Sequence, residues 1–185
     1  GFGSLGRSVA RWLVVQGATK LILTGRRGGA GAEDFIVSLG VSVPAVAADI
    51  SDPVAVAEIF SEPVAGVIHA AGINDDSLLA DQSWDRFEAV FAAKVCGADN
   101  LNAATKELDL DFFVLFSSAA AVLGTPGQAN YAAANAHLDA LAHHRRELGL
   151  PGVSLGWGPW ADSAMAARAG ASVRQRSARE GIVAL

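Results

Sequence analysis

The stretch Phe112-Phe113-Val114-Leu115-Phe116-Ser117-Ser118 is a run of large apolar residues that ends in two hydroxyl side chains. Its length and composition predict a buried strand over Phe112 to Ser117. A long helical pattern follows from Gln128 to Leu148, and a second apolar segment, Gly152 to Leu155, comes after it. A strand, a helix and a strand in this order are typical of a parallel β-sheet whose faces are covered by helices.

The same alternation continues toward the N-terminus. Leu5, Val9 and Leu13 repeat every four residues before Gly17, which predicts a helix that ends near this glycine. Further helices are predicted over Val54 to Phe60 and Trp84 to Leu108, and further strands over Lys20 to Thr24, Val43 to Ala48 and Val64 to Ala70. From Ala161 to Leu185 the pattern loosens, as in a mobile helical segment near a site or an ordinary surface helix. The elements together predict an α/β fold with a doubly wound parallel sheet.

Composition excludes several classes of protein. The 185 residues are 51% hydrophobic and 18% charged, which fits one globular domain with a sizeable core. A net charge of −5 without a long basic block argues against nucleic acid as a partner. The apolar runs fall far short of the roughly 20 residues that cross a membrane, and no signal-peptide pattern is visible. The single cysteine, Cys96, and four scattered histidines predict neither a disulfide nor a metal site, so we expect a cytoplasmic protein.

The chain opens with the glycine-rich loop Gly1-Phe2-Gly3-Ser4-Leu5-Gly6. The spacing of its glycines lets the backbone approach a pyrophosphate, whose charge the N-terminus of the following helix would stabilise. A tight structural turn is the alternative explanation for such glycines. No strand precedes the loop in the 185 residues, so we expect that the chain is a fragment or that another segment supplies the first strand.

Two arginines predict which dinucleotide binds. Arg26 stands 20 residues after Gly6, at the end of the next predicted strand, where a carboxylate would bind the ribose hydroxyls of NAD. An arginine there favours NADPH, because its guanidinium can hold the 2′-phosphate, and Arg27 adds to the same positive field. The alternative is a solvated charge that follows a strand.

Two further segments belong to this predicted cofactor site. Asp49, followed by Ile50, ends another strand and is placed to accept a hydrogen bond from an adenine amino group. A helix cap is the competing interpretation, although Ser51 or Asp52 is better placed for that role. The small residues of His69-Ala70-Ala71-Gly72 allow a ribose and a nicotinamide to lie against the backbone, and we expect the histidine to be a packed residue at the strand end.

A set of polar residues predicts proton chemistry. Ser118 lies at the carboxyl end of its strand, and Tyr131 begins a helix that carries Asn135 four residues later on the same face. A tyrosine with a pKa near ~10 is a good proton donor to a carbonyl only when a cation lowers that pKa, and Lys94 is the candidate. The alternatives are a solvated helix charge for Lys94 and structural hydrogen bonds for Ser118 and Asn135.

Together these motifs resemble short-chain dehydrogenase/reductases, and specifically the catalytic half of a ketoreductase domain of a modular polyketide synthase. The resemblance runs through essentially the whole chain. Ordinary short-chain reductases place a lysine four residues after the catalytic tyrosine, whereas Asn135 stands there and Lys94 lies on an earlier helix; this exchange is a hallmark of the polyketide and animal fatty acid synthase reductases. The motifs are Gly1 to Gly6, Leu23-Thr24-Gly25-Arg26-Arg27-Gly28, His69 to Gly72, Lys94-Val95-Cys96-Gly97-Ala98, Phe116 to Ser118 and Gly127 to Asn135.

The resemblance implies a Rossmann-like fold and a role for each polar residue. Tyr131 would be the proton donor, Ser118 would orient the carbonyl, Lys94 would lower the tyrosine pKa and contact the ribose, and Asn135 would support the proton relay. The implied reaction is the NADPH-dependent reduction of a β-ketoacyl thioester that an acyl carrier protein presents on its phosphopantetheine arm. Such domains usually pair with a preceding structural half that binds no cofactor.

The resemblance also bears on the configuration of the product. Family members that give the D-hydroxyl (B-type) carry Leu-Asp-Asp after the fourth strand, where this chain has Asn74-Asp75-Asp76, with the last aspartate 18 residues before Lys94 as in the family. Members that give the L-hydroxyl carry a tryptophan eight residues before the catalytic tyrosine, where this chain has Leu123. Pro126 and Asn130 are also associated with the D outcome. The asparagine departs from the family pattern and leaves open that the two aspartates only cap a turn.

Two alternative functions stay open. The first is a free-standing short-chain reductase for a small ketone, against which Trp157-Gly158-Pro159-Trp160 and the exchanged lysine favour the synthase domain. The second is a redox-silent domain that binds NADPH or only supports its neighbours. The complete set of lysine, serine, tyrosine and asparagine argues against a silent domain.

Overall fold

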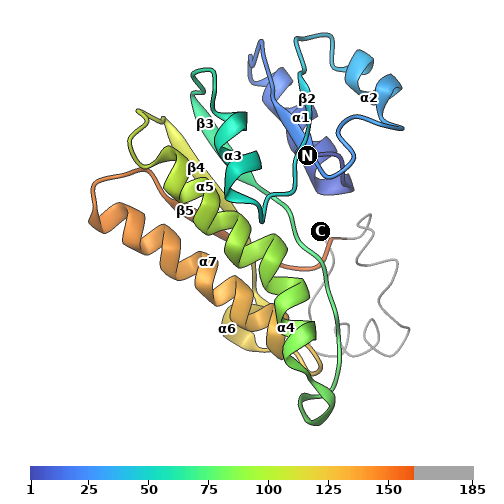
Figure 1. Cartoon of the computed structure of the whole chain (residues 1–185), viewed down its shortest axis with the longest axis vertical. Helices are drawn as coiled ribbons and strands as arrows, with labels where there is room; N and C mark the ends of the chain where they lie inside the picture. The colour runs from blue at the N-terminus through green and yellow to red at the C-terminus, as the bar shows by residue number, and fades with distance from the viewer. Residues whose placement is uncertain (161–185) are drawn as a thin grey trace.

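The computed structural model describes residues 1–160 and shows an α/β fold (Figure 1). The strands are β1 (Leu23–Gly25), β2 (Ala45–Ala47), β3 (Gly66–His69), β4 (Phe112–Ser118) and β5 (Val153–Trp157). The α-helices are α1 (Ser4–Val15), α2 (Glu33–Ser38), α3 (Pro53–Ile59), α4 (Trp84–Phe91), α5 (Gly97–Thr105), α6 (Ala120–Leu123) and α7 (Ala129–Glu147). A 3-10 turn, η1 (Leu79–Asp81), precedes α4, and a π-helical segment, η2 (Ala92–Cys96), joins α4 to α5.

The strands pair in parallel throughout residues 1–160. β1 pairs with β2, and β4 lies between β3 and β5. In the doubly wound order 3-2-1-4-5-6, these strands occupy positions 2, 3, 4, 5 and 6. The fold class is therefore as predicted. The described strands form two groups, β1 with β2 and β3 to β5, and the doubly wound order places its first strand between β1 and β3. Gly1 lies beside β1, since its nitrogen donates a hydrogen bond to the Thr24 carbonyl at 2.6 Å.

Two hydrophobic clusters hold helices against the strands. The larger cluster joins α3, α5 and α7 to β3 and β4, and at its centre Phe113, Leu115 and Leu138 are fully buried. Phe113 and Leu115 are two residues apart, so both project from the same face of β4. The smaller cluster joins α1 and α2 to β1 through Ala10, Leu23 and Phe35. In Figure 1, α5 and α7 run side by side over β3 to β5, away from the separate α1 and α2 group.

The five predicted strands are all present, with ends that differ by a few residues. The helix predicted over Trp84 to Leu108 is interrupted by the five π-helical residues of η2, which the apolar pattern did not indicate. The short helices α2 and α6 were not predicted, because six and four residues are too few to show a helical period. The prediction for Ala161 to Leu185 lies outside the described residues.

The structure also bears on membrane spans, metal-binding clusters and the single cysteine. Among residues 1–160, no helix is long and apolar enough to cross a membrane. The same residues contain no group of three or more His, Cys, Asp or Glu side chains that could hold a metal ion. The Cys96 thiol is free and exposed.

Candidate active site

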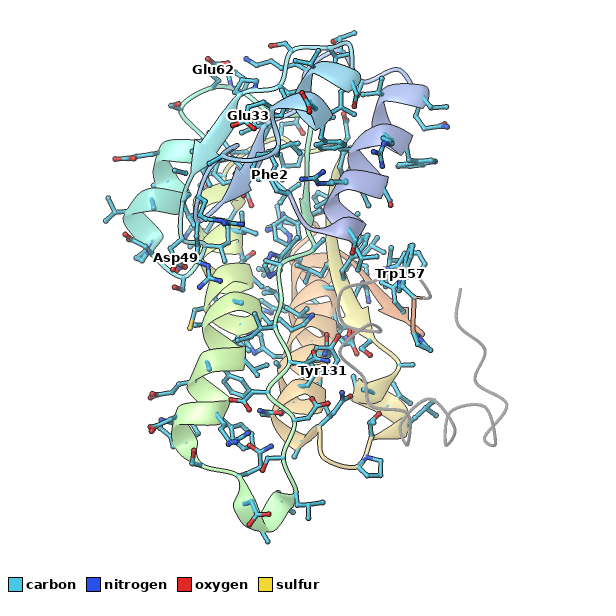
Figure 2. The ribbon with its side chains drawn as sticks, turned by 90° about the vertical axis from the view of Figure 1, so that its right-hand side faces the viewer. Phe2, Glu33, Asp49, Glu62, Tyr131 and Trp157 are labelled. Carbon is cyan, nitrogen blue, oxygen red and sulfur yellow. The ribbon has the colours of Figure 1, made fainter. Side chains whose placement is uncertain are left out.

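The predicted functional residues gather where the parallel strands end. Ser118 is the last residue of β4, and Gly72 lies just after β3. Tyr131 lies in the first turn of α7. Open α/β sheets bind ligands at this carboxyl edge. Figure 2 shows Phe2 and Asp49 in the upper half of the molecule and Tyr131 in the lower half.

Tyr131 is anchored through its neighbour Asn130. The Asn130 side chain is fully buried, and its Oδ1 accepts a hydrogen bond from the Tyr131 backbone nitrogen at 2.7 Å. Its Nδ2 donates to the Asp75 carbonyl at 2.9 Å. This amide thus satisfies one free N–H group at the start of α7 and ties the helix to another loop. The backbone at Tyr131 is therefore held in place by Asn130.

Ser118 and Asn135 lie close to the Tyr131 hydroxyl, since hydrogen bonding by both side chains acts on its pKa. The Ser118 Oγ also accepts from the Ala120 nitrogen at 3.2 Å, so this serine has a structural bond as well. The Asn135 Nδ2 donates to the Tyr131 carbonyl at 2.8 Å. Among residues 1–160 the buried Asn135 Oδ1 has no hydrogen-bond partner, which leaves an acceptor available at the site.

Lys94 reaches the same place from η2, and its side chain is buried with 3% exposure. Its Nζ donates to the Phe116 carbonyl at 2.9 Å and lies 5.2 Å from the centre of the Tyr131 ring. A Cβ at Gly72 would lie 2.9 Å from the Lys94 Cε, so the glycine makes room for the lysine. The alternative that Lys94 is a solvated charge is wrong. Burial lowers the pKa of Lys94 to about 8, against the opposite effect of the Asp139 charge.

The pKa of Tyr131 departs from the predicted direction. Burial raises it above its ordinary value and the negative charge of Asp76 adds to this, while the hydrogen bonds from Ser118 and Asn135 act in the opposite direction. The expected lowering by Lys94 is absent because the ammonium is bonded to a carbonyl and lies over the ring. With these residues alone, Tyr131 holds its proton at neutral pH.

The glycine loop forms a tight turn into α1. A Cβ at Gly6 would lie 2.2 Å from the Gly1 oxygen, so only glycine fits there, whereas a Cβ at Gly3 would meet nothing within 4 Å. Gly3 is the N-cap of α1 and supplies no side-chain cap, and Ser4 and Leu5 begin the helix. Uncapped N–H groups beside open space suit a phosphate anion. The loop residues therefore fit the pyrophosphate of a dinucleotide, while Phe2 packs against the smaller core cluster.

The predicted adenosine-binding residues lie on exposed segments after β1 and β2. Arg26 and Arg27 are both exposed, and the charge of Arg26 acts on the Asp49 carboxyl. Asp49 accepts hydrogen bonds from the Ser51 hydroxyl at 2.7 Å and from its nitrogen at 3.0 Å, and these bonds lower the pKa of Asp49. The cap of α3 is Asp52, so the competing interpretation of Asp49 as a helix cap is wrong.

The other predicted cofactor residues border the sheet edge. Ile50 packs against the larger core cluster, and its carbonyl accepts a hydrogen bond from Asn100 at 3.1 Å. Ala70 and Ala71 follow β3 directly, and the Ala71 residue is exposed. The exposed Ala71 therefore lies at the carboxyl end of β3, next to the glycine that borders Lys94.

The two aspartates after β3 bind to other elements rather than cap their own turn. The Asp76 carboxylate accepts hydrogen bonds from the Gln128 Nε2 at 3.1 and 3.2 Å, and the Ser77 nitrogen donates to the Gly127 carbonyl at 2.8 Å. The Ser77 to Gly127 bond joins the two backbones directly. The loop of Asp75 to Ser77 is therefore fastened to the turn that precedes Tyr131.

Sequence reasoning missed two residues of this network. Gln128 binds Asp76 from 52 residues away, and Arg86 of α4 forms an ion pair with Asp75. The Arg86 carbonyl also accepts from the Asn130 Nδ2 at 3.3 Å. Contacts between residues so far apart leave no periodic or local signal in a single sequence.

The parallel α/β fold, with serine, tyrosine, asparagine and lysine side chains at one edge, defines an oxidoreductase of the short-chain dehydrogenase/reductase class. The chain matches the family described as "KR domain" over residues 1–162, and it belongs to this family. KR domains of polyketide synthases are ketoreductases, which act on a keto group with NAD(P)H as cofactor. The resemblance to ketoreductase domains, which the motifs indicated, is therefore confirmed.

Similar proteins place this domain among polyketide synthases. The chain is 50% identical over 184 residues to polyketide synthase GfsB of Streptomyces halstedii, covering 94% of this chain and 3% of that protein. It is 44% identical over 198 aligned residues to mycoketide-CoA synthase of Mycobacterium tuberculosis, covering 100% of this chain and 5% of that protein. The chain thus spans a small part of these curated relatives, which are multidomain polyketide synthases.

Solved ketoreductase structures share the fold closely. An A1-type ketoreductase superposes with a TM-score of 0.91 at 44% identity, covering 99% of this chain and 40% of that one. The first ketoreductase of the tylosin synthase superposes with a TM-score of 0.88, also at 44% identity, covering 94% of this chain and 40% of that one. Because A-type enzymes are among these neighbours, the overall fold does not assign the chain to the B-type.

Proposed function

We propose that this chain is the catalytic subdomain of a ketoreductase that reduces a β-ketoacyl thioester to the D-β-hydroxyacyl thioester with NADPH during polyketide chain extension. The observation that carries the proposal is the grouping of Ser118, Tyr131, Asn135 and Lys94 at one edge of the sheet. Three different elements, β4, α7 and η2, contribute these side chains.

Each residue has a role that follows from its contacts. The hydroxyls of Ser118 and Tyr131 donate hydrogen bonds to the substrate carbonyl oxygen and stabilise the charge that develops on it. Tyr131 then transfers its proton to that oxygen, which suits a hydroxyl whose pKa keeps it protonated. The unpartnered Asn135 Oδ1 can hold the water that returns a proton to the tyrosine. The Lys94 ammonium, buried beside the Tyr131 ring, would contact the ribose of the bound cofactor.

The residues present fit NADPH, which supplies the hydride that reaches the carbonyl carbon. Gly1 to Gly6 and the start of α1 would hold the pyrophosphate, and Ala70 to Gly72 would face the ribose and nicotinamide. Arg26 and Arg27, both exposed after β1, would hold the 2′-phosphate. The Asp49 carboxylate would accept a hydrogen bond from the adenine amino group. The paired positive charges are the reason to propose NADPH over NADH.

The D-configuration of the product rests on side chains rather than on the backbone. Asp76 and Gln128 fasten the loop after β3 to the turn before Tyr131 on one side of the site. On the other side, Leu123 stands where L-producing relatives carry a tryptophan, and it is 71% exposed. The fastened loop and the absence of the bulky ring favour entry of the thioester arm from one side. Pro126 and Asn130 agree with this assignment.

Residues 1–185 would form one such subdomain of a larger cytoplasmic synthase. Its partners would be an acyl carrier protein that delivers the substrate on phosphopantetheine, a structural half of the ketoreductase, and the neighbouring synthase domains. The proposal rests on the multidomain character of relatives such as GfsB.

The test is the loss of NADPH absorbance on addition of a β-ketoacyl thioester to the full-length protein. We expect ketone-dependent oxidation that is faster with the carrier-bound thioester than with a small free ketone. Equal rates for both would favour the free-standing reductase instead. Quenching of NADPH fluorescence on binding, without any oxidation, would reveal a redox-silent domain.

A further inference from the structure

His69, the last residue of β3, is buried with 4% exposure but is not part of the group around Tyr131. Its Nε2 lies 3.3 Å from the backbone carbonyl of Lys94. A carbonyl oxygen can only accept a hydrogen bond, so Nε2 must carry the proton and donate it. His69 therefore contacts the backbone of the residue that brings the lysine to the site.

The contact falls on the irregular part of the helix. In η2 the Gly97 nitrogen bonds to the Ala92 carbonyl, five residues back, instead of four. Such π-helical turns are rare, and they occur frequently at functional sites. The Lys94 carbonyl already accepts a backbone N–H at the end of η2, and His69 supplies it with a second donor from outside the helix. The irregular turn is thus supported from the sheet.

Gly97 makes the approach of the ring possible. A Cβ at this position would lie 3.2 Å from the His69 Cε1 and 2.8 Å from the Ile50 Cγ2. Gly72 plays the matching part on the other side, since its Cβ would lie 2.9 Å from the Lys94 Cε. Two glycines therefore let β3 and η2 pack closely enough to hold the lysine between them.

The histidine supplies this support without adding a charge. Burial lowers the pKa of His69 to about 4, and the positive charge of Lys94 acts in the same direction. The ring is therefore neutral at physiological pH. A permanently charged donor at this place would repel the lysine ammonium.

The geometry points to His69 as a positioning residue that sets the π-helical turn and thereby aims the Lys94 ammonium at the Tyr131 side of the site. This inference rests on the proposed function for its effect on turnover. The ring itself touches neither Tyr131 nor Ser118 in the contacts described above, so it acts through Lys94.

The test compares His69→Met and His69→Gln in the full-length protein, because the two side chains have similar length and only glutamine keeps a donor. We expect His69→Met to lower kcat about 10- to 100-fold with little change in KM for the thioester, as a displaced catalytic group does. His69→Gln is expected to restore most of the loss. Equal kcat values for the two variants, or an unchanged kcat for a folded His69→Met, overturn the inference.

A double-mutant cycle separates positioning from general stability. If His69 acts through Lys94, His69→Met has no further effect on kcat once Lys94 is replaced by alanine. Additive losses overturn the inference. Should His69→Met fail to fold, Gly97→Ala is the second variant, because alanine suits a helix and its Cβ would push against the His69 ring. We expect Gly97→Ala to lower kcat in the same way. A folded Gly97→Ala with normal kcat overturns the inference.

Labelling of lysines gives a readout that does not need turnover. The chain has three lysines, and Lys20 and Lys106 are exposed controls for Lys94. With an amine-acylating reagent and mass spectrometry, we expect His69→Met to change the labelling rate of Lys94 and leave the two controls unchanged. If the wild-type protein binds but does not oxidise NADPH, the proposed function fails, while this measurement still decides the role of His69: an unchanged Lys94 rate overturns it.

Discussion

The two halves of the molecule hold their functional side chains in different ways. Around β3 to β5, Lys94 at 3% exposure and Asn135 at 0% are buried, and both side chains donate to backbone carbonyls. After β1 and β2, Arg26 and Arg27 are exposed, and Gly3 faces open space. Catalysis requires reacting groups in place before the substrate arrives, whereas an exposed arginine can adjust to a phosphate. We therefore expect substitutions in the first region to change kcat and those in the second to change cofactor affinity.

Replacing Tyr131 with phenylalanine is the strongest test of this contrast. The ring and its packing remain, but the proton donor is lost. We expect the rate to fall by about 10²–10⁴-fold, the usual contribution of general acid catalysis, with NADPH binding unchanged. Steady-state kinetics and fluorescence titration measure the two quantities. A variant with near-normal turnover would remove Tyr131 from the mechanism.

The pH dependence of kcat tests the buried lysine. Lys94 loses its proton as pH rises through about 8, whereas Tyr131 has a raised pKa and keeps its proton in that range. We expect kcat to fall above about pH 8. The Lys94→Met variant should have a lower kcat that does not fall over this pH range. A fall of kcat above pH 8 that persists in Lys94→Met would show that another group causes it.

Unfolding cannot explain that fall, because the stability effect of Lys94 has the opposite sign. Its pKa is about 8 in the folded chain and 10.5 at its ordinary value, so the unfolded state binds more protons between these values. Lys94 therefore raises the free energy of unfolding, and so stabilises the folded state, as pH rises from 8 to 10.5. Thermal melts across this range, with Lys94→Met as the control, separate the two effects.

Arg26→Ala probes the exposed region and is expected to act on affinity. A charged hydrogen bond to a phosphate contributes roughly 1.5–3 kcal/mol, so the Kd for NADPH should rise about 10- to 100-fold. NADH lacks the phosphate and should bind as before. Arg11→Ala, an exposed arginine of α1, is the matched control. Equal weakening for both cofactors would contradict the 2′-phosphate assignment.

The same contrast explains what the sequence could predict. The strands and the larger helices carry apolar periods that a single sequence reveals, and Tyr131 and Asn135 share a face because they are four residues apart. Gly6 was recognisable as part of a glycine-rich turn, because the turn leaves no space for a side chain there. These features depend on neighbours in the chain.

Features that depend on distant contacts were missed or mistaken. The π-helical turn at Lys94, the Asp76 to Gln128 bond and the raised pKa of Tyr131 all arise from packing between elements far apart in the chain. The pKa prediction considered the charge of Lys94 but neglected burial, which is the larger effect here. Sequence motifs thus indicated candidate reacting groups, whereas the protonation of these groups depends on the folded environment.

The smallest expected effect concerns the loop that links the catalytic region to the turn before α7. We expect the wild-type protein to give predominantly the D-3-hydroxyacyl product from a diketide thioester. Asp76→Ala removes both hydrogen bonds from Gln128 and frees the loop on one side of the site, so the D to L ratio should fall about tenfold, which corresponds to ~1.4 kcal/mol between the two transition states. Asp81→Ala, in the exposed turn η1, is the control and should leave the ratio unchanged. Chiral chromatography of the products measures these ratios. A predominantly L product from the wild type would reject the B-type assignment, whereas a D product whose ratio is insensitive to Asp76→Ala would keep the assignment and deny the loop its part in stereocontrol.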